Sequence, residues 1–137
     1  MKQTVSQLTI GFHPELPTDV TFDGPDTSSD GGLLLLRQAD MQLGLCKWFS
    51  SLLPDERMGS RVQHDRLEQV RQRIYQIACG YEDCNDANHL RHDPLLKTVC
   101  DRTPTDAGLS SQPTLTRLEN AVTGKALRLL TARFEDE

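Results

Sequence analysis

The densest group of chemically capable side chains lies between residues 79 and 100. Ligand types suited to zinc follow the spacing Cys79-x4-Cys84-x4-His89-x2-His92, with Cys100 close behind. Zinc ligand pairs are normally separated by about a dozen residues, so this spacing fits poorly. Cys79 also falls beside the apolar stripe of a predicted helix, where a free cysteine behaves as a small hydrophobic residue. The pattern favours structural cysteines over a zinc site.

Acidic side chains crowd into the same stretch. Glu82, Asp83, Asp86 and Asp93 could offer the oxygen ligands that Mg²⁺ prefers. No predicted strand holds them rigidly, and Asp86 and Asp93 stand where two helices are expected to begin, so helix capping is the favoured interpretation. The sequence has no phosphate-binding loop, nucleophile elbow, dinucleotide fingerprint or zinc-protease helix. We therefore expect no catalytic residue, metal ligand or cofactor in this chain.

The charge distribution says more than the net charge. The 137 residues carry a net charge of −5, which by itself argues against a nucleic-acid partner. Residues 1–56 hold three basic and eight acidic side chains, whereas residues 57–133 hold twelve basic and nine acidic ones. Only the second part, with a net charge of +3, would suit a polyanion.

Three arginines of this second part lie off the apolar stripe of a predicted helix. Arg66, Arg71 and Arg73 can form a solvated face with Asp65 and Glu68 as partners three or four residues away. They can instead contact phosphates. The charge pattern alone favours the solvated face and leaves phosphate contact open.

Cysteine use and hydropathy indicate the compartment. Four irregularly spaced cysteines do not form the framework of a secreted disulfide-rich domain. The first twelve residues lack the apolar run of a signal peptide, and the longest apolar run, Leu33–Leu36, is far below the ~20 residues of a membrane span. We expect a soluble cytoplasmic protein with no membrane partner.

Two short β-like segments open the chain. Apolar residues alternate over Thr4–Phe12, which predicts a strand that His13-Pro14 ends, and Val20–Phe22 predicts a second strand. The two can pair as a hairpin, which is marginal unless it packs on something else. We assign residues 1–27 to this β segment and residues 28–137 to a helical domain.

Helical periodicity dominates the rest of the chain. The fold class is therefore mainly α, a short N-terminal β-hairpin followed by a bundle of about five to seven helices. The expected helices span residues 31–45 (capped by Ser28, Ser29 or Asp30 and ended or bent by Gly44), 46–53, 61–79, 86–91, 93–100, 110–122 and 125–134.

Several finer expectations follow from the residue types. The helix over residues 31–45 is apolar on more than one side and should be central. Trp48 should lie in the core rather than serve as a platform for stacking bases. Thr116 and Glu119 have the spacing of a capping box. The helix over residues 61–79 should end in a turn at Gly80. It should bury one apolar face, formed by Leu67, Val70, Ile74, Ile77, Ala78 and Tyr81.

Four blocks of this sequence resemble a known family in the same order. The chain is similar to bacterial insertion-sequence transposases of the DDE type, the group named transposase DDE domain group 1. The run Gly-Tyr-Glu-Asp…Asp…Leu-Arg…Asp-Pro is its most specific part. The matching blocks are Ser28–Arg37, Gln72–Ala87, Leu90–Pro94 and Ser111–Asn120.

The resemblance implies an enzyme that cuts the ends of its own element and joins them to target DNA. In such enzymes two Asp and one Glu on an RNase H-like fold hold two metal ions, so Mg²⁺ is expected for the full-length protein. The family's first catalytic Asp lies on a strand downstream of the Ser111–Asn120 block. We therefore expect this chain to be an N-terminal piece, truncated before the catalytic core, in which Glu135, Asp136 and Glu137 do not match the triad. Whether it acts as an enzyme is left open.

The role implied for such a piece is binding of the element's end DNA and positioning of the catalytic domain. Charge and location select seven expected DNA contacts: Arg61, Arg66, Arg71, Arg73, Arg91, Lys97 and Arg102. The alternative is an interaction fragment that does not bind DNA. It would pair, as a homodimer or with full-length transposase, through exposed apolar helix faces such as Ala126, Leu127, Leu129 and Leu130.

Overall fold

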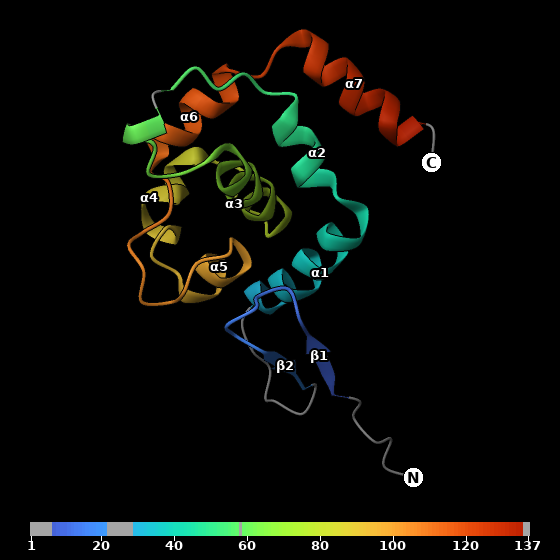
Figure 1. Cartoon of the computed structure of the whole chain (residues 1–137), viewed down its shortest axis with the longest axis vertical. Helices are drawn as coiled ribbons and strands as arrows, with labels where there is room; N and C mark the ends of the chain where they lie inside the picture. Colours follow the sequence, from blue (N-terminus) through green and yellow to red (C-terminus); the bar gives the residue numbers. More distant parts are fainter. Residues whose placement is uncertain (1–6, 22–28, 58, 136–137) are drawn as a thin grey trace.

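The computed structural model describes residues 7–21, 29–57 and 59–135. Within these residues the chain is mainly helical with one two-stranded antiparallel hairpin, so the predicted fold class is confirmed (Figure 1). Seven α-helices occur in this part, within the expected number. The elements are β1 (Leu8–Ile10), β2 (Thr18–Val20), η1 (Ser29–Gly32), α1 (Leu33–Leu43), α2 (Leu45–Ser51), η2 (Gly59–Arg61), α3 (Arg66–Ala78), η3 (Cys84–Asp86), α4 (Ala87–Leu90), α5 (Pro94–Val99), α6 (Gln112–Asn120) and α7 (Gly124–Glu135).

The hairpin pairs β1 with β2, with Thr9 opposite Asp19 and a hydrogen bond of 2.8 Å between their side chains. The second strand begins at Thr18, two residues before the predicted Val20, and pairs Thr18 with Ile10 and Val20 with Leu8. Thr4–Ser6 and Phe22 of the predicted strands lie outside the described residues. Ile10 and Phe12 are buried, so the hairpin is stabilised by the helical body rather than by its own short ladder.

Helix α1 is less central than predicted. Leu33 is buried, but Leu35, Met41 and Leu43 keep 45%, 46% and 56% of their surface exposed. Gly44 ends the helix as predicted, with a left-handed φ of 65° that glycine adopts without strain. Of the expected capping residues, Ser28 lies outside the described residues, and Gly32 occupies the N-cap position without a side-chain bond.

The central element is α3, which contacts α2 on one side and α6 on another (Figure 1). It begins at Arg66 rather than at Arg61, because Asp65 is extended and its carboxylate accepts the Glu68 N–H at 2.7 Å. Residues 59–61 form a separate 3₁₀ turn. The helix ends at Ala78, and Gly80 follows with φ 93°.

The buried face of α3 is more polar than its apolar residues suggested. Val70 is buried, but Ile77 is 47% exposed and Ala78 is also exposed, which corrects the predicted face. The fully enclosed side chains include three glutamines and one tyrosine, namely Gln69, Gln72, Gln76 and Tyr75. Hydrophobic periodicity missed this face because it contains glutamines; Gln69 and Gln72 form side-chain hydrogen bonds, whereas the Gln76 amide has no partner among the described atoms.

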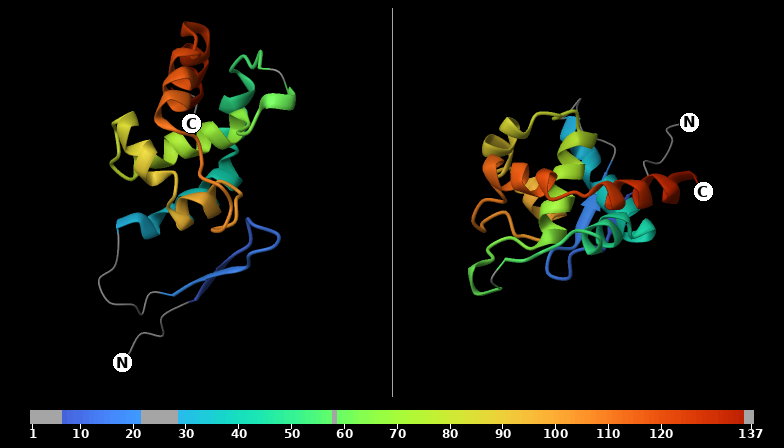
Figure 2. Two further views of the ribbon diagram at one scale, coloured as in Figure 1. Left: turned by 90° about the vertical axis from the view of Figure 1, so that its left-hand side faces the viewer. Right: turned by 90° about the horizontal axis from the view of Figure 1, so that it is seen from above.

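Two further expectations are corrected near the C-terminal end. Thr116 and Glu119 lie inside α6, whose N-cap is Ser111, so they form no capping box. Trp48 is half-buried, and the Arg133 guanidinium of α7 lies 4.7 Å from its ring centre. The β-hairpin and α7 lie at opposite ends of the molecule (Figure 2).

Candidate nucleic-acid interface

The loop that leads into α3 collects arginines from three parts of the chain. Arg57 binds Asp55 through two hydrogen bonds of 2.6 Å and donates a third, of 2.8 Å, to the His64 carbonyl. The hydrogen bonds from the Arg57 side chain lower the pKa of Asp55 to about 2. Through this bidentate pair and the third bond, Arg57 connects Asp55 to His64, the second residue before α3.

Arg66, the first residue of α3, reaches back to the same loop. Its guanidinium donates to the Pro54 carbonyl at 3.1 and 3.3 Å and to the Gln69 side-chain oxygen at 3.0 Å. Asp55 approaches it only to 4.0 Å, so most of its direct partners are neutral groups. A surface hollow of about 420 Å³ borders this residue, lined by Pro54, Glu56, Arg57, Arg66 and Ala121.

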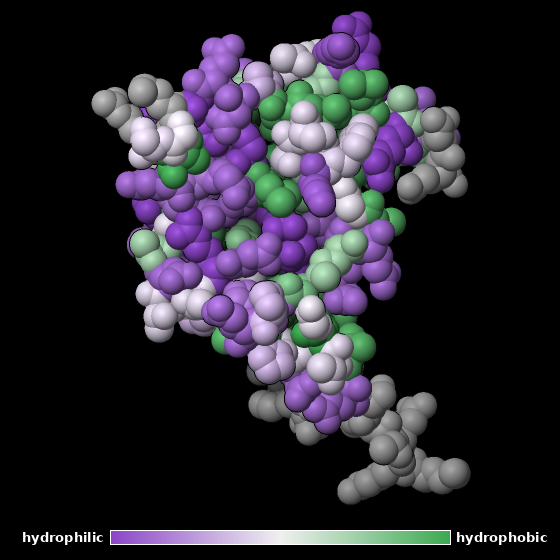
Figure 3. Space-filling view, viewed as in Figure 1, coloured by the Kyte–Doolittle hydropathy of each residue, from purple (hydrophilic) through white to green (hydrophobic). Residues whose placement is uncertain are grey.

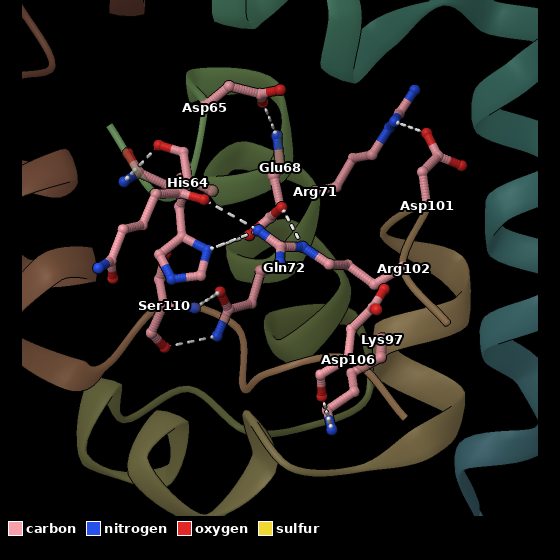
Figure 4. A network of polar contacts seen from close by, with 12 residues as sticks. His64, Asp65, Glu68, Arg71, Gln72, Lys97, Asp101, Arg102, Asp106 and Ser110 are labelled. Carbon is pink, nitrogen blue, oxygen red and sulfur yellow. Dashed lines mark hydrogen bonds and ion pairs between the residues drawn. The ribbon is translucent and has the colours of Figure 1, made fainter. Parts of the chain in front are cut away.

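Arg102 lies in the segment that follows α5 and also contacts the loop before α3. It donates to Glu68 at 2.8 Å and to the Gln63 carbonyl at 2.9 Å, and it lies 3.2 Å from His64 Nδ1 (Figure 4). His64 and Glu68 also share a hydrogen bond. We call Arg57, Arg66 and Arg102 the arginine cluster. Arg61 belongs to the same loop, but its side chain lies outside the described part of the structure.

Three of the other expected DNA contacts are occupied within the protein. Arg73 donates to Glu119 at 2.5 Å and to the Glu82 carbonyl at 2.6 Å, which ties α3 to α6 and to the turn after Gly80. Arg71 pairs with Asp101. Lys97 is 6% exposed and donates to the Asp106 and Pro104 carbonyls at 2.8 and 3.3 Å. These three cations hold loops in place.

Arg91 lies under the loop over residues 101–111. Its carbonyl accepts the Leu109 N–H at 3.0 Å, and its buried Nε has no hydrogen-bond partner among the described atoms. A Cβ atom at Gly108 would come within 2.8 Å of that Nε and 3.0 Å of the His92 ring. Glycine at position 108 therefore lets the loop close over Arg91 and His92.

An ion network of buried and half-buried arginines with one buried and one exposed aspartate connects the loop over residues 101–111 to the core. Asp101 accepts from Arg37 at 2.9 and 3.1 Å. It also accepts from Arg71 (Figure 4). Asp40 lies 3.7 Å from both arginines and accepts the Tyr75 hydroxyl at 2.7 Å. Burial and this bond raise the pKa of Tyr75. Periodicity could not reveal these partners, because Arg71 and Asp101 are 30 residues apart in sequence.

Arg37 of this network also reaches the hairpin. Its guanidinium carbon lies 5.4 Å from the centre of the Phe12 ring, within the range of a cation–π contact. Arg37 is only 4% exposed, and Phe12 is 6% exposed. One arginine thus joins α1, the end of α5 and the N-terminal hairpin.

Comparison with known protein families gives one match, to the profile described as Transposase DDE domain group 1, over residues 12–136. The chain belongs to this transposase family. The match begins within the hairpin region, at Phe12, and runs through α7. No curated protein and no solved structure matches the sequence. Family membership confirms the predicted resemblance and associates the chain with DNA transposition.

The acidic stretch of this transposase chain does cap helices, but not with all the residues expected. Asp93 accepts the Leu96 N–H at 2.8 Å and caps α5, as predicted. Asp86 stands at the N-cap of α4 without a side-chain bond. Asp83 instead accepts the Asn85 N–H at 2.8 Å and caps η3. The sequence identified the segment and one of its two capping aspartates.

Metal-ligand chemistry is not assembled in the part of this transposase chain that the structure describes. There, no group of three or more His, Cys, Asp or Glu side chains converges to hold an ion. The four cysteines are free thiols, with Cys46 and Cys100 buried and Cys79 and Cys84 partly buried. In the same described residues, no helix has the length and apolar content to cross a membrane.

Proposed function

We propose that this transposase chain binds duplex DNA through the arginine cluster, together with Arg61 of the same loop. The observation that carries the proposal is the convergence of Arg57, Arg66 and Arg102 on the loop before α3. Each guanidinium has five N–H donors, so its intramolecular partners leave donors unused. Arginines held in this way can contact phosphates without a large loss of side-chain entropy.

Partial exposure supports this assignment. The side chains of Arg57, Arg66 and Arg102 keep 31%, 16% and 23% of their surface exposed. The side chains of Arg71 and Arg73 keep only 11% of their surface exposed. We therefore retain Arg61, Arg66 and Arg102 as proposed DNA contacts and add Arg57.

The other four predicted DNA contacts do not touch DNA in this proposal and act through the structure instead. Arg71 and Arg73 brace α3, while Arg91 and Lys97 hold the loop over residues 101–111. In this proposal they position the cluster, and the chain recognises and orients the DNA on which transposition acts. The DNA at the ends of the element is the proposed partner.

The test is a fluorescence anisotropy titration of the purified chain with duplex DNA that flanks its gene, at two salt concentrations. Affinity should fall steeply with salt, because neutralised phosphates release counterions. The double variant Arg66→Gln/Arg102→Gln should bind at least ~10-fold more weakly, with a salt slope that is smaller by about 1–2.

A matched control removes two charges elsewhere. Lys47→Gln/Arg117→Gln changes two exposed cations that have no described ion-pair partner, and it should bind nearly as well as the unaltered chain. Circular dichroism melts of both variants establish that they fold. Equal losses in the two double variants, or no binding by the folded unaltered chain, would overturn the proposal.

A second candidate function is supported by α7. Leu127, Leu129 and Phe134 of this helix are 51%, 41% and 60% exposed. Exposed apolar side chains clustered on one helix are typical of a surface that binds another protein. The candidate is pairing with another transposase chain, either this one or a full-length form.

A further inference from the structure

Helix α7 touches the body of the protein along one side only. Ala126 is 2% exposed, and Leu130 and Arg133 are half-buried on the same side of the helix. Arg133 donates to the Leu43 carbonyl at 3.0 Å and covers the Trp48 ring. The helix therefore lies against α2 and the end of α1, and projects from the top of the molecule (Figures 1 and 2).

An apolar stripe runs beside this contact. Leu127, Leu130 and Phe134 follow the i, i+3, i+7 spacing of one helix face, and we call these three residues the α7 seam. Leu127 and Phe134 are more than half exposed. Leu43 is 56% exposed and borders a shallow hollow with Phe134. Figure 3 shows hydrophobic residues on the surface of this upper region, over α2 and α7.

Two charges near the ends of α7, on Lys125 and Glu135, oppose its dipole, whereas Arg133 in the last turn follows it. Lys125 and Arg128 lie in the N-terminal half, where the helix end is partly positive, and Glu135 lies at the C-terminal end. The sequence continues with Asp136 and Glu137. Lys125 in the first turn and Glu135 at the last position are unfavourably placed within one helix. An antiparallel second copy of the same helix would bring acidic residues beside basic ones and oppose the two dipoles.

We propose that two copies of this chain associate through antiparallel pairing of their α7 seams. In this arrangement Leu127 faces Phe134 of the second copy, and Arg128 faces Glu135 of the second copy. Both pairs are nearly symmetric about Thr131, so the twofold axis passes close to that residue. The contact is self-complementary, as a twofold interface must be.

This pairing deepens the second candidate function and does not depend on DNA binding by the arginine cluster. One helix face per chain makes a small interface, of the size seen in weak complexes. The expected dissociation constant is therefore micromolar, on the order of 10–100 µM.

Sedimentation equilibrium without DNA, from about 5 to about 200 µM protein, tests the pairing. The seam variant Leu127→Gln/Phe134→Gln should raise the dissociation constant at least ~10-fold. The matched control Leu35→Gln/Ile77→Gln changes two apolar residues of 45% and 47% exposure on α1 and α3, and it should associate like the unaltered chain.

A charge exchange tests the register. Arg128→Glu and Glu135→Arg should each weaken association, because each places like charges together across the interface, and the double variant should restore it. Variants are compared only after their melting curves show a folded protein. A folded chain that stays monomeric at about 200 µM overturns the pairing. So does equal association of the seam variant and its control, or a double charge exchange without recovery.

Because no DNA is present in these measurements, their failure leaves the arginine cluster untouched. Conversely, a chain that pairs through α7 and does not bind DNA would refute the DNA-binding proposal alone.

Discussion

Gln72 holds the main chain of Ser110 with two hydrogen bonds of 2.9 Å, donating from Nε2 to the carbonyl and accepting the N–H at Oε1 (Figure 4). Both residues have no exposed surface. The amide side chain thus pairs with the main chain of the segment that leads into α6, as the main chain of a neighbouring strand would. It also attaches the loop over residues 101–111 to the middle of α3.

Replacing Gln72 by leucine should destabilise the fold strongly. The leucine fills a similar volume but leaves the Ser110 N–H and C=O buried without partners, at about 1–3 kcal/mol for each group. We expect a loss of about 3 kcal/mol in the free energy of unfolding, measured by urea denaturation. Gln63→Leu is the control, because that side chain is exposed and should change stability by less than ~0.5 kcal/mol. A loss below 1 kcal/mol in Gln72→Leu would refute the importance of the pair.

Asp101 both forms ion pairs and adopts a left-handed backbone conformation. It pairs with Arg37 and Arg71, and its φ of 63° is the only positive φ of a non-glycine residue among those described. Aspartate and asparagine tolerate this conformation better than alanine does. Asp101→Asn should therefore lose only the charge, and Asp101→Ala should lose the charge and add backbone strain.

We expect Asp101→Asn to cost about 1–2 kcal/mol and Asp101→Ala about 2–3 kcal/mol in the free energy of unfolding. The values are reduced because 43% of the Asp101 side chain remains exposed to screening solvent. Asp86→Ala removes an exposed carboxylate without a capping bond and should be nearly neutral. Equal losses for the asparagine and alanine variants of Asp101 would show that φ strain contributes nothing.

The order and type of the elements were predictable because they depend on local signals. Gly44 ends α1, Asp93 caps α5, and the alternation around Ile10 marks a strand. The periodicity predicts too early a start for α3, because nothing in it distinguishes residues 61–65 from the helix itself. The spacing of Asp65 predicts a charge partner, whereas its carboxylate acts as the cap.

The candidate site remains a prediction. The charge pattern points to residues 57–133, and within them Arg66 and Arg102 both donate to carbonyls of the segment that precedes α3. The charge pattern does not distinguish these two arginines from Arg73, which is paired within the protein, because its partner Glu119 is 46 residues away in sequence. Pairing of this kind depends on tertiary folding, and a single sequence without regular spacing carries no signal for it.

The four thiols should differ in reactivity. Burial raises the pKa of Cys46 to about 12 and raises that of Cys100 well above its usual value. The pKa values of Cys79 and Cys84 are also raised by burial, but both side chains are partly accessible. Because the thiolate is the reactive form, iodoacetamide at neutral pH should label Cys79 and Cys84 well before Cys46 and Cys100.

Peptide mass spectrometry of timed samples measures the four rates. Labelling in denaturant gives the matched control, in which all four cysteines should react alike. Labelling of Cys46 in the folded protein as fast as that of Cys84 would contradict its placement beside Asp40, which accepts the Cys46 N–H at 2.9 Å.

Acid should selectively remove the contribution of Asp55. Hydrogen bonds from Arg57 lower its folded-state pKa from 3.8 to about 2, so the pair stabilises the fold at pH values above the unfolded pKa and loses this contribution as the pH falls through the folded pKa. Asp55→Asn should cost less than ~1 kcal/mol in the free energy of unfolding at pH 7, since the pair is partly exposed and screened.

Urea denaturation from pH 7 to pH 3 should show that the difference in the free energy of unfolding between this variant and the unaltered chain shrinks below pH 4. A difference that stays constant over this range would show that Asp55 acts through packing rather than charge. Glu56→Gln, which alters the neighbouring exposed carboxylate, is the control and should show no such pH dependence.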